Sequence, residues 1–177
     1  TINNGEPLQL SNGNKENIMF LSLRDVNLQS LPANIFTDYP KLLSLFVSSC
    51  NLNRLASSDF KNAQKLKVFH IYGTELTSIA NQVFSTCSEL ESLVIASSPI
   101  TKIESNAFEG LKALEELILS ELPLGNLHPS LFVSLTALLE IQIERCNLTS
   151  IGGDIFKSNL KLTKVDLNDN LIESIDD

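Results

Sequence analysis

The hydrophobic positions of this chain recur every 24 residues. Starting from Ile18, one spacing of apolar residues returns six times without an insertion or deletion. The first position of each unit is held by Ile18, Leu42, Leu66, Leu90, Leu114, Leu138 and Leu162. Apolar residues also hold the fourth and sixth positions, an alternation typical of a strand with one buried face. The pattern predicts a solenoid over residues 18–177, with units beginning at 18, 42, 66, 90, 114, 138 and 162 and the last one incomplete.

The nineteenth position of every complete unit is phenylalanine. The six residues are Phe36, Phe60, Phe84, Phe108, Phe132 and Phe156. Because units of equal length place equal positions side by side, these rings are predicted to form one continuous column beneath the convex side of the solenoid.

This pattern resembles the leucine-rich repeat family, in the 24-residue class of extracellular proteins, from Ile18 to about Ile175. The segment Leu-Pro-Ala-Asn-Ile-Phe at residues 31–36 is similar to the convex turn of Toll-like receptor ectodomains, and the chain also resembles secreted arthropod immune proteins. The resemblance implies an α/β fold. In it, a right-handed solenoid carries a parallel concave β-sheet of about seven strands and short helical or irregular convex segments. It also implies an extracellular location.

The ninth position departs from that family, which usually has asparagine there. The seven residues are Val26, Cys50, Thr74, Ser98, Leu122, Cys146 and Asn170. Threonine and serine would replace the amide weakly, and valine and leucine not at all. The backbone groups of these turns are therefore expected to pair with other backbone groups or with trapped water.

The two ends of the chain depart from the repeat. Residues 1–17 lack it and contain the turn formers Asn-Gly twice, so they are predicted to form a capping segment. The seventh unit stops at Asp177, before its nineteenth position, and the cysteine-rich caps of the family are absent. The expectation is a fragment, or a solenoid that continues beyond this chain.

Charge is unevenly distributed along the chain, whose formal net charge is −8. Residues 1–88 hold seven Lys or Arg against six Asp or Glu, whereas residues 89–177 hold six against fifteen. An acidic chain repels phosphate backbones, so no nucleic acid is expected as a partner. The asymmetry either steers a basic partner toward the C-terminal half or serves only to keep the surface soluble. No apolar run approaches the roughly 18 residues of a membrane segment.

The three cysteines are expected to be buried free thiols. Cys50 and Cys146 lie four strands apart, about 19 Å at roughly 4.8 Å per strand, which is too far for a disulfide. Cys87 belongs to a different edge of the unit. No set of residues has the spacing of a metal site, and the stretch from Asp166 to Asn170 lacks the glycine and glutamate of a calcium loop. No cofactor or metal is expected.

Catalytic residues are not apparent either. His128 precedes a proline in a convex turn, and His70 is expected to face outward from the sheet with no serine, cysteine or acid placed as its partner. The chain is therefore not expected to be an enzyme. Asn147-Leu148-Thr149 is the one acceptor sequence for N-glycosylation, at a surface turn.

The outward positions of the predicted strands suggest a contact surface. An apolar and aromatic band is formed by Phe20, Phe46, Val68, His70, Tyr72, Val94 and Ile118. Beside it lies an acidic band, of which Glu116, Glu140 and Glu144 are expected to contact a partner; its other members are Glu115, Glu121, Asp166 and Asp169. Exposed apolar patches mark contact sites, although strands favour such residues for their own sake.

Two functions remain open from the sequence. The first is a non-enzymatic module that binds a protein ligand through its concave face, and the resemblance implies a setting in innate immunity or in a receptor. The second is a structural or assembly solenoid whose apolar band forms a homodimer interface.

Overall fold

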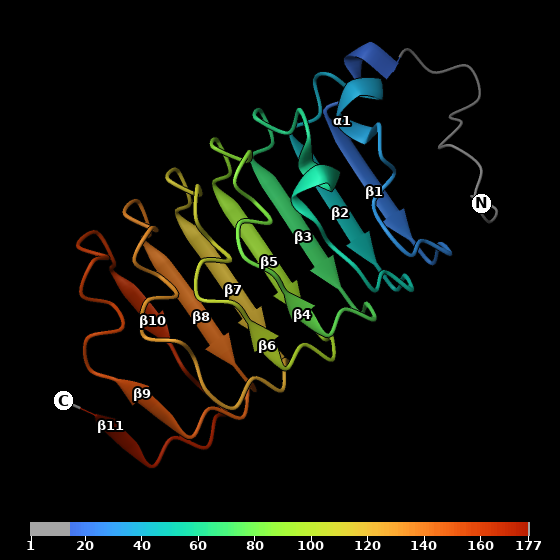
Figure 1. Cartoon of the computed structure of the whole chain (residues 1–177). Helices are drawn as coiled ribbons and strands as arrows, with labels where there is room; N and C mark the ends of the chain where they lie inside the picture. The colour runs from blue at the N-terminus through green and yellow to red at the C-terminus, as the bar shows by residue number, and fades with distance from the viewer. Residues whose placement is uncertain (1–14, 177) are drawn as a thin grey trace.

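The computed structural model describes residues 15–176, which form an elongated solenoid of equal coils (Figure 1). Seven strands make one parallel sheet: β1 (Phe20–Arg24), β2 (Ser44–Ser48), β3 (Val68–Tyr72), β5 (Ser92–Ala96), β7 (Glu116–Ser120), β8 (Glu140–Glu144) and β10 (Lys164–Asp166). They lie side by side in chain order, with β1 and β10 at opposite ends. The predicted parallel sheet of about seven strands is confirmed.

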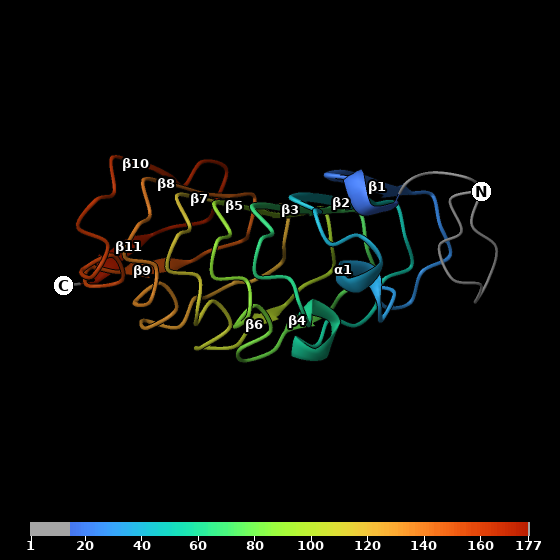
Figure 2. The same ribbon diagram turned by 90° about the horizontal axis from the view of Figure 1, so that it is seen from above.

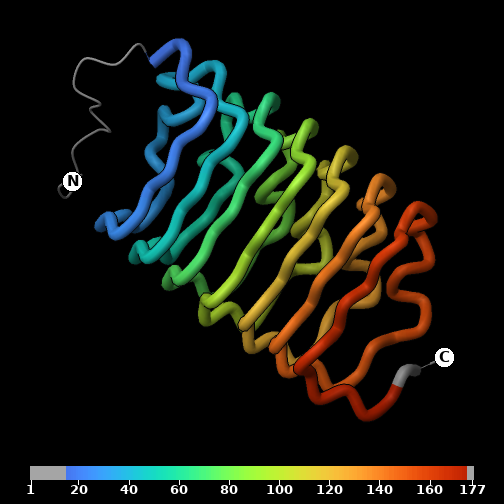
Figure 3. The backbone as a smooth tube through the Cα atoms, turned by 180° about the vertical axis from the view of Figure 1, so that it is seen from behind, coloured from blue at the N-terminus to red at the C-terminus, as the bar shows by residue number. Residues whose placement is uncertain are grey.

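Every strand pairs with the next in a register of 24 residues. Leu45 lies opposite Phe69, for example, and Leu117 lies opposite Ile141. This register is the one that keeps the apolar side chains inside, because a slip by one residue would turn a whole strand over. Viewed from behind, the backbone shows the successive coils following one another without a bulge (Figure 3).

The side away from this sheet contains short elements (Figure 2). Helical turns on this side are α1 (Ile35–Asp38) and η2 (Ser57–Phe60), whereas η1 (Lys15–Asn17) lies next to β1. Two small parallel sheets follow, β4 (Ser78–Ile79) with β6 (Lys102–Ile103), and β9 (Ser150–Gly152) with β11 (Ser174–Asp176). The sequence predicted helical or irregular segments here and missed these two-stranded sheets. Of the predicted capping segment, only residues 15–17 lie within the described part of the chain.

The six phenylalanines at position nineteen form the predicted column. Neighbouring ring centroids are 5.2–6.4 Å apart along the whole series. The four inner rings are fully buried, whereas Phe156 at the C-terminal end is only partly covered. The rings from Phe84 onward stack with interplanar angles of 10–13°. One aromatic column therefore links six successive coils.

Truncation of this column should cost more in the middle than at the end. Phe108→Ala should lower the free energy of unfolding by about 3–5 kcal/mol, because it leaves a cavity between two stacked rings. Phe156→Ala should lower it by about 1–2 kcal/mol, since its ring is already partly in water. Urea unfolding followed by circular dichroism measures both. Equal losses would mean that the column is not a continuous core element.

Residues at the ninth position form hydrogen bonds with the backbone groups of their turns in a way that the sequence did not predict. The Cys50 thiol donates to the carbonyl oxygens of Ser48 (3.2 Å) and, in the preceding coil, Leu23 (3.7 Å). The Cys146 thiol likewise donates to those of Glu144 (3.2 Å) and Leu119 (3.5 Å). The expected amide appears once, where Asn170 Nδ2 donates to the Ile143 carbonyl at 2.6 Å. Thiols therefore take over part of the donor role of asparagine.

Two further polar side chains serve turns of this row. The Ser98 hydroxyl accepts from the Thr74 backbone N–H (3.2 Å) and donates to the Ala96 carbonyl (3.1 Å). Next to Val26, which has no polar atom, the Asn51 side chain from the following unit accepts the Leu28 N–H at 2.6 Å. Besides the expected partners, which were other backbone groups or trapped water, side chains therefore also satisfy these turns.

All three cysteines are free and buried, as predicted. Burial raises the pKa of the Cys87 thiol to about 12 and also raises the pKa of Cys146. A thiol reacts as its thiolate, so the raised pKa lowers the reactivity of Cys87 and Cys146. Burial also limits the access of reagents to all three thiols.

We expect Ellman's reagent to modify none of the three thiols of the folded protein at pH 8 within an hour. In 6 M guanidinium it should modify all three. One thiol that reacts at once in the native protein would show that its coil opens, or is packed differently from the structure.

Candidate functional site

The outer face of the seven-stranded sheet, hereafter the sheet face, corresponds to the predicted concave face. It is formed by the strand residues that alternate with the core positions. Among the residues predicted to bind a partner, Phe20 and Tyr72 are the most exposed, at 58% and 38%. Phe46, Val68 and Ile118 are half-buried on the same face. The sheet face therefore presents apolar groups to solvent, mainly over β1 to β3.

Four rings form a continuous row across three neighbouring strands. Phe20 and Phe46 have ring centroids 5.0 Å apart, and Phe46 meets His70 edge-on at 4.7 Å. Tyr72 continues the series, with its centroid 6.2 Å from that of His70. We call these four residues the ring row. Edge-on and tilted contacts between such rings are favourable and hold their orientations.

Val94 does not belong to the exposed band. The sequence placed it among the outward apolar residues, but its side chain is only 4% exposed. It lies on β5 between His70 and Ile118, its partners in register on the two neighbouring strands. Larger side chains on both sides cover this smaller one. Val94 is therefore corrected from a contact residue to a packed part of the surface.

A hydrogen-bonded relay joins the ring row to the acidic band. His70 Nε2 lies 3.0 Å from Ser92 Oγ, and Ser92 Oγ donates to Glu116 Oε2 at 2.6 Å. Because the single hydroxyl proton of the serine points to the carboxylate, the imidazole Nε2 carries its own proton and donates to Ser92. The Tyr72 hydroxyl lies 3.5 Å from His70 Nδ1 and completes the chain of contacts.

A serine and an acid that the sequence did not place there do lie beside His70. Ser92 and Glu116 come from later coils and reach His70 only through the strand register, which placed them one and two strands away. The arrangement still differs from that of a catalytic nucleophile. A nucleophilic serine gives its proton to the imidazole, whereas Ser92 gives its proton to Glu116.

Burial lowers the pKa of His70, and the nearby Glu116 carboxylate works in the opposite direction. Burial also raises the pKa of the Tyr72 hydroxyl, with a second contribution from Glu116. Both groups therefore favour their neutral forms at pH 7, and the ring row is uncharged there.

Titration of His70 by NMR tests this relay. The imidazole should titrate below its ordinary pKa of about 6.5, and Glu116→Gln should move it lower still because the opposing carboxylate charge is gone. In the native protein, the lowered pKa means that the unfolded chain binds the proton more readily than the folded one. His70 should therefore reduce the stability of the fold as the pH falls below about 6.5. A pKa that rises in Glu116→Gln would contradict the relay.

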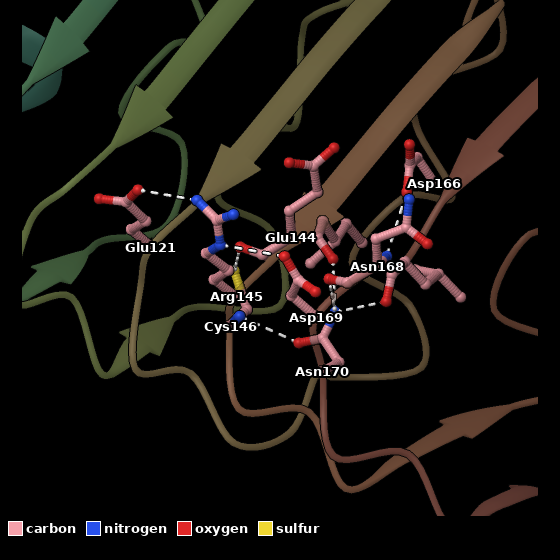
Figure 4. A network of polar contacts seen from close by, with 10 residues as sticks. Glu121, Glu144, Arg145, Cys146, Asp166, Asn168, Asp169 and Asn170 are labelled. Atoms are coloured by element: carbon pink, nitrogen blue, oxygen red, sulfur yellow. Dashed lines mark hydrogen bonds and ion pairs between the residues drawn. The ribbon is translucent and has the colours of Figure 1, made fainter.

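The acidic band divides into paired and unpaired carboxylates. Glu140 bonds both Lys164 Nζ and Gln142 Nε2 at 2.5 Å, and the bond with Lys164 is the main cause of its lowered pKa. Glu144, by contrast, makes no ion pair with any described residue, and its carboxylate points away from Arg145 (Figure 4). Glu144 is thus available to a partner, whereas Glu140 is already engaged.

A second polar network lies beyond the ends of the strands. Arg145 bridges Asp169 (3.1 Å) and Glu121 (3.4 Å), and all three residues sit at the eighth position with positive φ (Figure 4). Such exposed pairs contribute about 0–1 kcal/mol each, so they hold side chains together more than they stabilise the fold. They remove Glu121 and Asp169 from the freely available acidic groups.

Other candidate chemistry is limited. Within the described part of the chain, no three His, Cys, Asp or Glu side chains form a group that could hold a metal ion. No helix of that part has the length and apolar character of a membrane span. Asn147 is exposed in the turn after β8, with φ 55°, so its glycosylation stays a prediction.

Equal coils, one parallel sheet and a shared aromatic column define a repeat solenoid. A family model described as the BspA type leucine-rich repeat region, in six copies, matches residues 55–177. The chain therefore belongs to the leucine-rich repeat family, in its BspA type. No curated protein sequence matches it as a relative.

Solved structures share this fold. The leucine-rich repeat domain of the type III effector XopL has a TM-score of 0.72 and 22% identity, covering 85% of this chain and 52% of that one. For Toll in the glycosylated Toll–Spätzle complex of Drosophila the values are 0.68 and 21%, with 89% and 24% covered. For TLR13 in complex with ssRNA13 they are 0.66 and 22%, with 86% and 25% covered. This chain thus spans between about a quarter and about half of those proteins.

Proposed function

We propose that this chain is a non-enzymatic recognition module that binds a protein partner through the sheet face. The observation that supports it best is the ring row, because four adjoining rings leave apolar surface in water that a partner could cover. Apolar patches of this kind, with aromatic side chains at the centre, are typical of protein contact surfaces. Phe20 and Tyr72 are the most accessible of these rings.

The acidic side of the face favours a protein over a nucleic acid. Outward positions on β7 and β8 carry three carboxylates and no Lys or Arg; they belong to Glu116, Glu140 and Glu144. Such a surface repels phosphates, so the RNA partner of the TLR13 complex is not a suitable guide here. Toll is the better guide, since its structure is described as a complex with Spätzle in development and innate immunity. By analogy we propose that this module acts outside the cell, in an immune or receptor setting.

Partner capture with matched variants tests the proposal. The intact protein, a Phe46→Ala/Tyr72→Ala variant and a Val133→Ala/Leu160→Ala control are immobilised and exposed to native extracellular fluid. Val133 and Leu160 are exposed apolar residues outside the strands, the first in a convex turn and the second in the turn that precedes β10. Proteins retained by the intact chain and by the control should be lost from the sheet-face variant, while all three unfold within about 1 kcal/mol of one another.

The same variants distinguish this proposal from the alternative, in which the apolar band forms a homodimer interface. Retention of one set of proteins by all three would sink the sheet-face proposal. Light scattering on the intact protein provides a further outcome: a dimer that dissociates in the Phe46→Ala/Tyr72→Ala variant would show that the ring row serves assembly instead.

A further inference from the structure

One row of the sheet face connects an exposed ring to an unpaired carboxylate. In the six strands of the seven-stranded sheet from β1 to β8, the seventh position of the unit is the last residue of the strand. From β3 to β8 this row runs in register through Tyr72, Ala96, Ser120 and Glu144. The two middle residues are small, so nothing longer than a hydroxymethyl group stands between the ring and the carboxylate. The row therefore has short side chains in its middle, an aromatic ring at one end and a carboxylate at the other. We call this row the floor.

The span of this floor is set by strand spacing. Three steps separate β3 from β8, which gives about 14 Å at roughly 4.8 Å per step. An extended segment rises about 3.3 Å per residue, so four residues cover about 13 Å. Residues four apart in such a segment also point to the same side, because side chains alternate.

We propose that the partner docks an extended segment along this floor, with an apolar or aromatic residue against Tyr72 and an arginine or lysine four residues away at Glu144. The inference rests on the proposed function and specifies the chemistry of its partner. Charge complementarity supports a cation at this end, since Glu144 lacks an ion pair within the described chain, whereas Glu140 on the same strand is already paired with Lys164. The ring row supports an apolar group at the other end.

Two synthetic peptides of one composition test the spacing. Phe-Ser-Phe-Thr-Arg-Ser-Arg has each arginine four residues after a phenylalanine, with all four side chains on one side. The isomer Phe-Arg-Ser-Thr-Ser-Arg-Phe has no such pair. With fluorescein labels, in about 50 mM salt where surface charges are little screened, the first peptide should bind the intact protein at least about fivefold tighter, because only it reaches both ends of the floor.

Three variants test the location. Glu144→Lys should weaken the first peptide about tenfold, whereas Asp154→Lys, with the same charge change on an exposed convex turn, should change it by less than about twofold. Ser120→Tyr should block the floor. The fold accepts both sheet-face changes, because the same position carries Arg24 in the first unit and Tyr72 in the third.

Equal affinities for the two peptides, equal effects of Glu144→Lys and Asp154→Lys, or no binding of the first peptide up to 1 mM would each overturn the inference. The proposed function fails separately. If Phe46→Ala/Tyr72→Ala loses captured proteins while Glu144→Lys retains them, the sheet face binds a protein, but its segment is not the basic one inferred here.

Discussion

Equal coil length is the constraint on which this molecule depends. Each coil contains 24 residues, and so each strand lies beside the next with the same pairs in contact from β1 to β10. A single coil cannot bury enough apolar surface to offset the entropy of ordering its backbone. Stacking supplies the missing contacts, because the phenylalanine column and the parallel ladder both join one coil to its neighbours. A coil of a different length would interrupt both.

The same register creates the surface chemistry. Residues 22 and 24 positions apart become neighbours, so His70 meets Ser92, and Ser92 meets Glu116. The ring row likewise combines residues from three coils. Because the core positions are nearly invariant, sequence differences between coils accumulate on the outward positions. The sheet face is therefore where one coil is chemically distinguished from another, with rings at one end and carboxylates at the other.

Most of the fold could be predicted from the sequence, since apolar periodicity alone determined the strands, their register and the column of rings. Interactions that depend on side-chain direction could not. Val94 occupies an outward position, yet its larger neighbours bury it. The cysteine thiols at position nine replace asparagine as hydrogen-bond donors. The sequence did not indicate this role, because their surroundings are apolar. Of the candidate site, the ring row followed from position, whereas pairing of Glu140 and isolation of Glu144 required the structure.

Nuclear Overhauser contacts between strand protons provide the most direct measurement of this register. In uniformly labelled protein, contacts should join residues 24 apart in all six neighbouring strand pairs, such as Leu45 with Phe69 and Leu93 with Leu117. The His70 ring should also contact Ser92. Contacts centred on a separation of 23 or 25 in any pair, instead of on 24, would contradict the equal coils, and the arrangement of the sheet face would fail with them.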